Sequence, residues 1–155
     1  MRKTAKDVMT KNVIMVEEDL VIDNLIGLFQ KKNISAAPVI DKKKKLVGIV
    51  TKTDIIGTYI DAHIDLNLKF GLKDILGDTQ EESSIEILSC TDLRAKDIMV
   101  SDPITVSENT TIKKMAEIMV DNRIHRLIVM RKNTIVGIVS TLDMLYYISG
   151  REKSE

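Results

Sequence analysis

Two stretches of the chain carry apolar residues at the spacing of an amphipathic helix. Positions i, i+3, i+4 and i+7 are apolar in both stretches: Ile22, Leu25, Ile26 and Phe29, then Ile112, Met115, Ala116 and Met119. This period predicts two helices, each with one buried stripe. Asp19 and Asn109 stand just ahead of the stripes, where a side-chain oxygen is expected to accept from a free backbone N–H at the helix start.

Short apolar runs separated by polar residues follow each of these helices. They are residues 37–40 and 46–50 in the first case, and residues 127–130 and 135–139 in the second. Each pair predicts two strands joined by a turn, with Lys42–Lys45 in a solvated turn rather than a nucleic-acid contact. A short extended segment is expected before each helix and a further helix after each second strand. The repeating unit is therefore strand, helix, strand, strand, helix, an α+β (α/β-like) arrangement.

The sequence itself repeats together with this pattern. Residues 5–9 read AKDVM and residues 95–99 read AKDIM, while GIVTKTD at 48–54 returns as GIVSTLD at 137–143. Neither set of strands buries both of its faces alone, so we expect the two copies to pack against each other.

The repetition also predicts how the chain is divided. Residues 1–63 and 94–150 are the predicted copies, and residues 151–155 are a polar tail. Residues 64–93 are a connection whose apolar spacing fits either a short helix or a strand.

Composition narrows the function without identifying it. A chain of 155 residues with 44% apolar content fits one packed domain, and 23 basic against 23 acidic residues give no overall field for nucleic acid or membranes. The lack of a long apolar stretch or signal-peptide core predicts a cytoplasmic protein. The single cysteine, Cys90, forms no intrachain disulfide, and no Cys/His spacing among the two histidines resembles a metal site.

Candidate chemistry lies where the second strand of each copy gives way to a helix. Thr51 and Asp54 in the first copy, and Ser140 and Asp143 in the second, place a hydroxyl and a carboxylate three residues apart. Such a pair can be a capping box that satisfies backbone donors. It can also hold a nucleotide, because a helix N-terminus attracts phosphate and a carboxylate accepts from ribose hydroxyls. The spacing alone leaves both interpretations open.

Taken together and in order, these motifs resemble a tandem pair of cystathionine-β-synthase (CBS) domains. The matching residues are the Asp-(Val/Ile)-Met opening of each copy, the Ile34-x-x-x-Pro38-Val39-Ile40 strand, and the closing Gly-Ile-Val-(Thr/Ser)-x-x-Asp. The resemblance implies a module with pseudo-two-fold symmetry, often dimerised, with two clefts for adenosine-containing ligands. It leaves the connection and the tail uncovered.

The resemblance also implies which residues form each cleft. In the first cleft they are Thr51, Thr53, Asp54, Ile104, His125 and Arg126, and in the second they are Ser140, Asp143, Ile14, Ser35 and Ala36. The two aspartates would hold ribose, the hydroxyls would contact ribose or phosphate, and the two isoleucines would flank the base.

One segment of the second copy carries a more specific likeness. Residues 122–127 (NRIHRL) are similar to the phosphate-binding segment in the γ subunit of AMP-activated protein kinase. His125 and Arg126 offer charge-assisted donors for a phosphate, whereas Arg123 suits a helix C-terminus equally well. The first copy has the uncharged Ser35 and Ala36 instead, so we expect unequal clefts.

The sequence shows no nucleophile with a base and an orienting group, which favours a non-enzymatic protein. We therefore expect a regulatory module that senses AMP, ADP, ATP or S-adenosylmethionine and requires no cofactor or metal. It would form a homodimer and signal to a protein partner, without binding nucleic acid or membrane. The alternative is a constitutive dimerisation or scaffold subunit whose clefts are vestigial.

Overall fold

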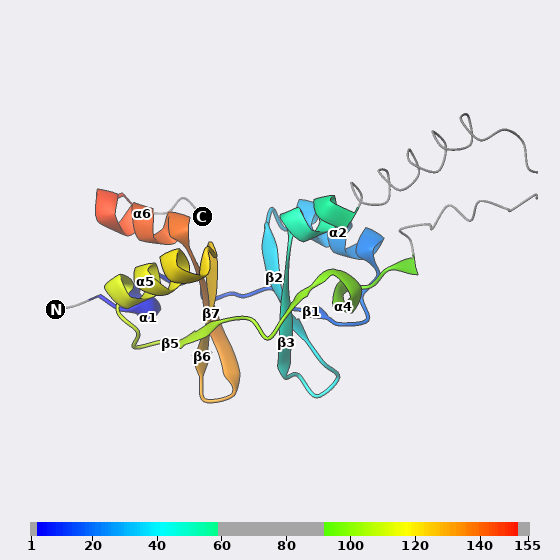
Figure 1. The fold of residues 1–155 in the computed structure, drawn as a ribbon, viewed down its shortest axis with the longest axis horizontal. Coiled ribbons are helices and arrows are strands. Elements are labelled where there is room, and N and C mark those ends of the chain that lie inside the picture. Colours follow the sequence, from blue (N-terminus) through cyan, green and yellow to red (C-terminus); the bar gives the residue numbers. More distant parts are fainter. Residues whose placement is uncertain (1–2, 59–91, 152–155) are drawn as a thin grey trace, which may run out of the picture.

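The computed structural model describes residues 3–58 and 92–151, which form two similar halves (Figure 1). The strands of the first sheet lie in the order β1 (Val16–Glu17), β2 (Ala36–Ile40), β3 (Leu46–Thr51) and β4 (Val100–Ser101). Those of the second sheet are β5 (Thr105–Ser107), β6 (Arg126–Arg131) and β7 (Thr134–Ser140). In each half the first pairing is parallel and the hairpin pairing is antiparallel.

Helices cover the outer face of each sheet, and the two sheets lie between them (Figure 1). They are α1 (Ala5–Val8), α2 (Ile22–Lys31), the helical residues 52–58, α4 (Ala95–Ile98), α5 (Ile112–Asn122) and α6 (Thr141–Ser149). The predicted order of strand, helix, strand, strand, helix is confirmed in both copies, as is the α+β class.

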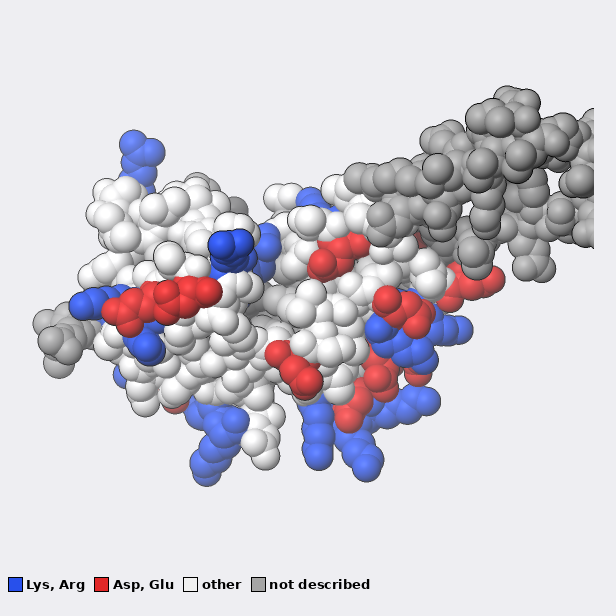
Figure 2. Space-filling model, in the orientation of Figure 1, with Lys and Arg blue, Asp and Glu red and all other residues white. Residues whose placement is uncertain are grey.

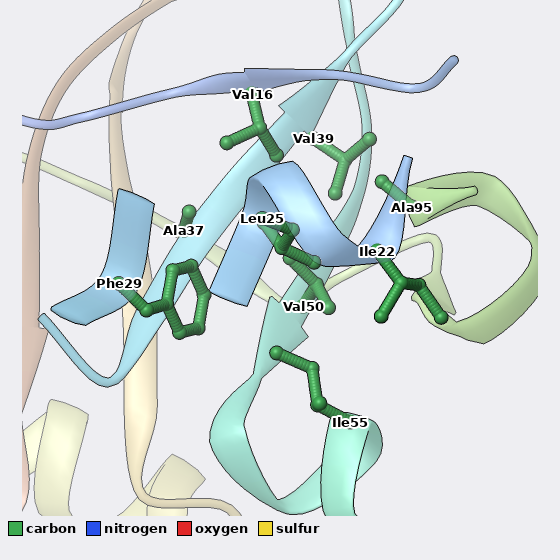
Figure 3. Packing of buried hydrophobic residues seen from close by; sticks show 9 residues of the cluster. All are labelled: Val16, Ile22, Leu25, Phe29, Ala37, Val39, Val50, Ile55 and Ala95. Atoms are coloured by element: carbon green, nitrogen blue, oxygen red, sulfur yellow. The ribbon is translucent and has the colours of Figure 1, made fainter. Parts of the chain in front are cut away.

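The predicted apolar stripes form the two cores. In the first half, Leu25 and Phe29 of α2 pack with Ala37 and Val39 of β2 and with Val50 of β3 (Figure 3). The second half repeats this arrangement with Met115 and Met119 of α5 against Leu127, Val129 and Val139. The core residues of each strand alternate with residues that face the other half, which follows from the two-residue period of a strand.

The two copies exchange their opening segments. Ala95 at the start of α4 is buried in the first core, and Ala5 at the start of α1 is buried in the second. Backbone hydrogen bonds fix both, from Ala95 N to Leu20 O and from Ala5 N to Thr110 O, each 2.8 Å long. Each core therefore contains the first residues of the other copy, although the bounds drawn along the sequence stay a prediction.

The exchange explains why the same two motifs occur in both copies. The Met99 side chain lies so close over Gly48 that a Cβ there would overlap its sulfur and stand 2.8 Å from its Cγ. Met9 lies over Gly137 in the same way, with 2.7 Å to its Cγ. The methionine of each opening motif thus packs on the glycine of the opposite copy's closing motif, where a larger residue would not fit.

The predicted caps at Asp19 and Asn109 are wrong. The N-cap residue of α2 is Val21, and that of α5 is Thr111, whose side chain accepts from the Lys114 N–H. Each helix begins at the first residue of its apolar stripe, Ile22 or Ile112, and the residue just before it is the N-cap, so both predicted residues lie two positions too early.

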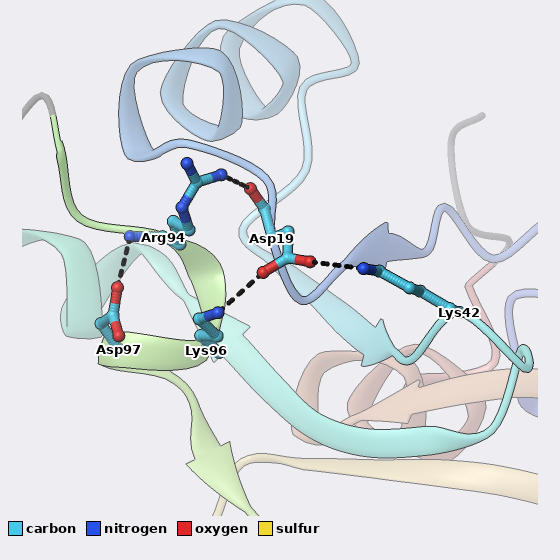
Figure 4. A network of polar contacts seen from close by, with 5 residues as sticks. All are labelled: Asp19, Lys42, Arg94, Lys96 and Asp97. Atoms are coloured by element: carbon cyan, nitrogen blue, oxygen red, sulfur yellow. Dashed lines mark hydrogen bonds and ion pairs between the residues drawn. The ribbon is translucent and has the colours of Figure 1, made fainter.

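Asp19 instead holds α4 against the first half (Figure 4). Its carboxylate accepts from Lys96 Nζ at 2.7 Å, and its backbone carbonyl accepts from Arg94 Nη1 at 2.6 Å. Lys42 Nζ completes the network at 3.7 Å from the same carboxylate. The Lys96 hydrogen bond and charge lower the pKa of Asp19. The side chain therefore ties an exchanged segment to its new core.

Lys42–Lys45 lie in the turn between β2 and β3, where Asp41 Oδ1 accepts from the backbone N–H groups of Lys43 and Lys45. All four lysines are exposed, and basic side chains project below this hairpin in Figure 2. The predicted solvated turn is confirmed.

Several sequence-based predictions fall outside the described residues. They concern Cys90, nearly all of the connection at 64–93, the end of the tail, and His63, one of the two histidines for which no metal site was expected. Within residues 3–58 and 92–151, no helix is long and apolar enough to cross a membrane. The same residues contain no group of three or more His, Cys, Asp or Glu side chains suited to a metal ion.

Candidate functional site

The hydroxyl–acid pair of the first copy forms a capping arrangement at the end of β3. Asp54 Oδ2 accepts from both the backbone N–H and the hydroxyl of Thr51, each at 2.7 Å, and Asp54 N donates to Thr51 Oγ1 at 3.3 Å. Among the described residues, the other oxygen, Oδ1, has no hydrogen-bond partner. Capping therefore occupies one carboxylate oxygen, and the second remains able to accept from a ligand.

A cavity of about 400 Å³ lies beside this junction and is lined by all six residues predicted for the first cleft. Thr51, Thr53 and Asp54 come from the first copy, while Ile104, His125 and Arg126 come from the second. The site lies between the halves, so neither copy can form it alone. Its volume falls in the range of small-molecule sites.

The local backbone explains how the second copy reaches the cavity. Helix α5 ends at Arg123, which adopts a left-handed conformation with φ of 54° and donates from its backbone N–H to Met119 O and Val120 O. This turn directs the next residues into β6, where Arg126 and Ile128 face the cavity and Leu127 faces the core. Arg123 itself does not line the cavity, which supports its interpretation as a helix C-terminus.

Charge in the cavity is unevenly compensated. Arg126 Nη2 donates to Ser35 Oγ at 2.7 Å, and no described carboxylate pairs with Arg126 or His125. A guanidinium has five N–H donors, so further donors remain for a ligand. The second copy therefore offers N–H donors of Arg126 and His125 for an anion, and Asp54 offers a carboxylate for hydroxyl groups, while Asp102 adds a second carboxylate to the lining.

Seven further residues line the cavity that were not among the six predicted for it: Ile49, Val100, Asp102, Pro103, Asn122, Ile124 and Ile128. Asn122 and Ile124 belong to the 122–127 segment, and Ile49 belongs to the closing motif of the first copy. Two of them could have been found from strand periodicity, because Ile49 stands two residues before Thr51 and Ile128 two after Arg126. Asp102 and Pro103 directly precede Ile104. Val100 is included because β4 pairs with β3, with Val100 opposite Ile49, and this pairing cannot be read from the sequence.

The structure places the five residues predicted for the second cleft differently. Ser140 and Asp143 repeat the capping arrangement, with Asp143 Oδ2 accepting from Ser140 N and Oγ at 2.7 Å each. Asp143 is only 6% exposed and lines a cavity of about 210 Å³ with Asp7, Val8, Tyr146, Tyr147 and Arg151. The other four predicted residues do not line that cavity.

The remaining members of the second set lie elsewhere. Ala36 begins β2 and pairs with Thr51, Ile14 precedes β1, and Ser35 accepts the hydrogen bond from Arg126. Leu142, the counterpart of Thr53, is exposed and brings no hydroxyl. The second set of residues therefore contains no arginine or histidine and no counterpart of the Thr53 hydroxyl, although Arg151 lines the cavity beside Asp143.

The fold and the motifs identify the class of protein. The family model of the CBS domain matches residues 5–61 and 95–150, and the chain belongs to this family as a tandem pair. It is 34% identical over 150 residues to the uncharacterized protein MJ1426 of Methanocaldococcus jannaschii, covering 90% of this chain and 88% of that protein.

Solved structures share the fold. The CBS domain pair of protein MJ0100, in complex with 5-methylthioadenosine and S-adenosyl-L-methionine, has a TM-score of 0.71 at 22% identity over 98% of this chain and all of that chain (100%). CBSX2, in complex with AMP, has a TM-score of 0.68 at 21% identity and covers 96% of this chain and 97% of that one. At these identities the likeness shows the fold alone.

Proposed function

We propose that this CBS pair is a regulatory module that binds an adenosine-containing ligand in the first cleft. The observation that carries the proposal is the convergence of six predicted residues from both copies on one cavity. A convergence of polar groups in a mostly apolar pocket is typical of a ligand site. Ligands of this class bound to MJ0100 and CBSX2 support the same interpretation.

The arrangement of the cavity suggests how the ligand binds. Asp54 accepts from ribose hydroxyls through Oδ1, and the Thr53 hydroxyl, which has no hydrogen-bond partner among the described residues, adds a donor nearby. His125 and Arg126 bind phosphate, where charge-assisted hydrogen bonds are strongest. The base packs on apolar residues of the wall, including Ile104, which is 38% exposed. The Arg126 cation favours AMP, ADP or ATP over S-adenosylmethionine.

Because the cavity lies between the two halves, ligand binding can change how the halves are arranged. The walls of the cavity belong to different halves, so a ligand that fits one relative arrangement better shifts the population toward it. A protein partner that contacts both halves then reads the shift. The module acts by binding and not by catalysis.

A constitutive scaffold subunit is the second candidate, and one surface favours it. Leu142, Leu145 and Ile148 follow one another at three-residue spacing on α6 and are 55%, 58% and 71% exposed. The surface over α6 is mostly uncharged in Figure 2. A second copy of the chain covering this stripe would form a homodimer with or without a ligand, because exposed apolar patches favour association.

Calorimetric titration separates the two candidates. We expect heat and thermal stabilisation with at least one of AMP, ADP, ATP and S-adenosylmethionine, and weaker binding of adenosine. Arg126→Ala should weaken AMP more than adenosine, while Lys132→Ala, an exposed cation on the β6–β7 turn, serves as the matched control. No binding of any ligand to a well-folded dimer would instead support the scaffold.

A further inference from the structure

We propose that Ser35 is a positioning residue of the first cleft, which holds the Arg126 guanidinium where it receives a phosphate. This inference rests on the proposed function, since it concerns the ligand preference of the same cavity. The sequence predicted Ser35 as a residue of the second cleft, whereas this proposal assigns it a role in the first. The role is indirect, because Ser35 acts on the ligand through Arg126.

The hydrogen bond between the two residues crosses the boundary between the copies. Ser35 lies between α2 and β2 of the first copy, and Arg126 begins β6 of the second, 91 residues further along the chain. Arg126 Nη2 donates to Ser35 Oγ at 2.7 Å in a partly buried position. Partial burial strengthens such a charge-assisted bond, because less water competes for the donor.

The backbone of Ser35 is fixed to the other wall of the same cavity. Its carbonyl accepts from Lys52 N at 3.1 Å, and the next residue, Ala36, pairs with Thr51 across the β2–β3 ladder. Thr51 in turn donates to the Asp54 carboxylate. Ser35 therefore connects the residues proposed to hold ribose with the residue proposed to hold phosphate.

Restraining a long arginine side chain before the ligand arrives favours ligand binding. Unrestrained, such a side chain loses considerable rotamer freedom when it binds a ligand. Ser35 restricts that freedom before the ligand arrives while leaving donors of the guanidinium available. Because Ser35 accepts without a negative charge, it does not compete electrostatically with a phosphate, as a carboxylate at this position would.

The hydrogen bond from Arg126 to Ser35 has no counterpart in the repeated sequence. The position equivalent to Ser35 is His125, and the position equivalent to Arg126 is Ala36, which has no side-chain donor. The hydrogen bond between the copies can therefore form in one direction only. This asymmetry predicts that Ser35 affects phosphate preference in the first cleft, and that no equivalent residue does so in the second.

The test compares adenosine with AMP in four variants. Ser35→Ala should weaken AMP by about three- to tenfold, with adenosine affinity within about twofold of wild type because adenosine lacks the phosphate that Arg126 binds. Ser35→Thr keeps the hydroxyl and should restore AMP affinity. In an Arg126→Ala background, adding Ser35→Ala should cause no further loss. Equal weakening of both ligands, or a full additional loss in the double variant, would overturn the inference.

A second measurement needs no ligand. Nitrogen NMR of the Arg126 side chain should show restricted guanidinium rotation in the free wild-type and Ser35→Thr proteins and faster rotation in Ser35→Ala. Equal rotation in all three overturns the inference while leaving the proposed function intact. Failure of the wild type to bind AMP overturns the proposed function and the role of Ser35 in it, whatever the rotation.

Discussion

The two strand-to-helix junctions have the same internal geometry and different surroundings. Asp54 and Asp143 both accept two hydrogen bonds at 2.7 Å from the residue three positions earlier. Asp54 lines the cavity between the halves that also contains His125 and Arg126, whereas Asp143 is 6% exposed and faces a smaller cavity beside α1. The repeated motif therefore builds the helix start, and its neighbours decide what the junction can bind.

The difference also shows what duplication leaves free to change. The methionine–glycine contacts are present in both directions, because each core needs the opening segment of the other copy. The polar residues around the junctions do not contribute to the cores. Equivalent positions of the two copies can therefore differ without loss of the fold, as Thr53 differs from Leu142 and Ala36 from Arg126. We infer that the first cleft carries the regulatory function.

The largest predicted effect is that of the first-cleft carboxylate. Asp54→Asn keeps the size of the side chain but removes the charge that ribose hydroxyls contact, so AMP affinity should fall by about tenfold to a hundredfold. Asp143→Asn is the matched control, and it should change AMP affinity by less than about twofold. Calorimetric titration checks both. Equal losses in the two variants would contradict the proposed inequality of the clefts.

The two methionine–glycine contacts should contribute equally to stability, unlike the two clefts, which should differ in ligand binding. Gly48→Ala and Gly137→Ala each force a methionine side chain to move, and each should lower the free energy of unfolding by about 1–3 kcal/mol. Met99→Ala combined with Gly48→Ala should recover part of the packing loss, because the obstructing sulfur is gone. Denaturant unfolding measures these values. Unchanged stability in both glycine variants would mean that the contacts are looser than the structure indicates.

A smaller effect is expected from exchanging the residues that differ at the junctions. Thr53→Leu installs the second-copy residue in the first cleft and should weaken AMP by about two- to tenfold, the loss of one neutral hydrogen bond. Leu142→Thr, the reciprocal change, should leave AMP affinity unaltered. Thr53→Ser keeps the hydroxyl and serves as the control in the same titration. Tighter AMP binding by Leu142→Thr would show that the second cleft also takes the ligand.

The smallest effect concerns the pH dependence of the Asp19 network. Lys96 lowers the pKa of Asp19 below its ordinary value of 3.8, so the folded chain binds fewer protons there than the unfolded chain. The ion pair therefore stabilises the fold above that value, and the contribution disappears as pH falls through the folded-state pKa.

Asp19→Asn should accordingly destabilise the protein slightly at pH 7 and not at strongly acid pH. Unfolding of both proteins across this range measures the difference. Asp23→Asn, which removes an exposed carboxylate on α2, controls for the change in net charge. A constant difference at all pH values would exclude the electrostatic explanation.

The sequence was sufficient for features that depend on local spacing. The helical period placed the stripe of Leu25 and Phe29 correctly, because burial of one helix face leaves a regular pattern. The apolar run at residues 46–50 likewise predicted the strand β3. The six first-cleft residues came together as the family resemblance implied. Their ligand-binding roles stay proposals.

Features that depend on pairing between distant segments were not accessible in the same way. The exchange of Ala5 and Ala95 between the cores, the contribution of Val100 to the cavity and the bond from Arg126 to Ser35 all join segments far apart in the chain. Asp19 shows the same limitation. Aspartate is a common helix cap, but the carboxylate of Asp19 accepts a hydrogen bond from Lys96 of the second copy instead.

A crystal structure of the wild-type chain with AMP tests the central claim most directly. We predict one AMP in the cavity between the halves, with its ribose hydroxyls on Asp54 and its phosphate on His125 and Arg126, while Ser35 still contacts the guanidinium. AMP bound only beside Asp143, or an empty first cleft at saturating AMP, would contradict the account.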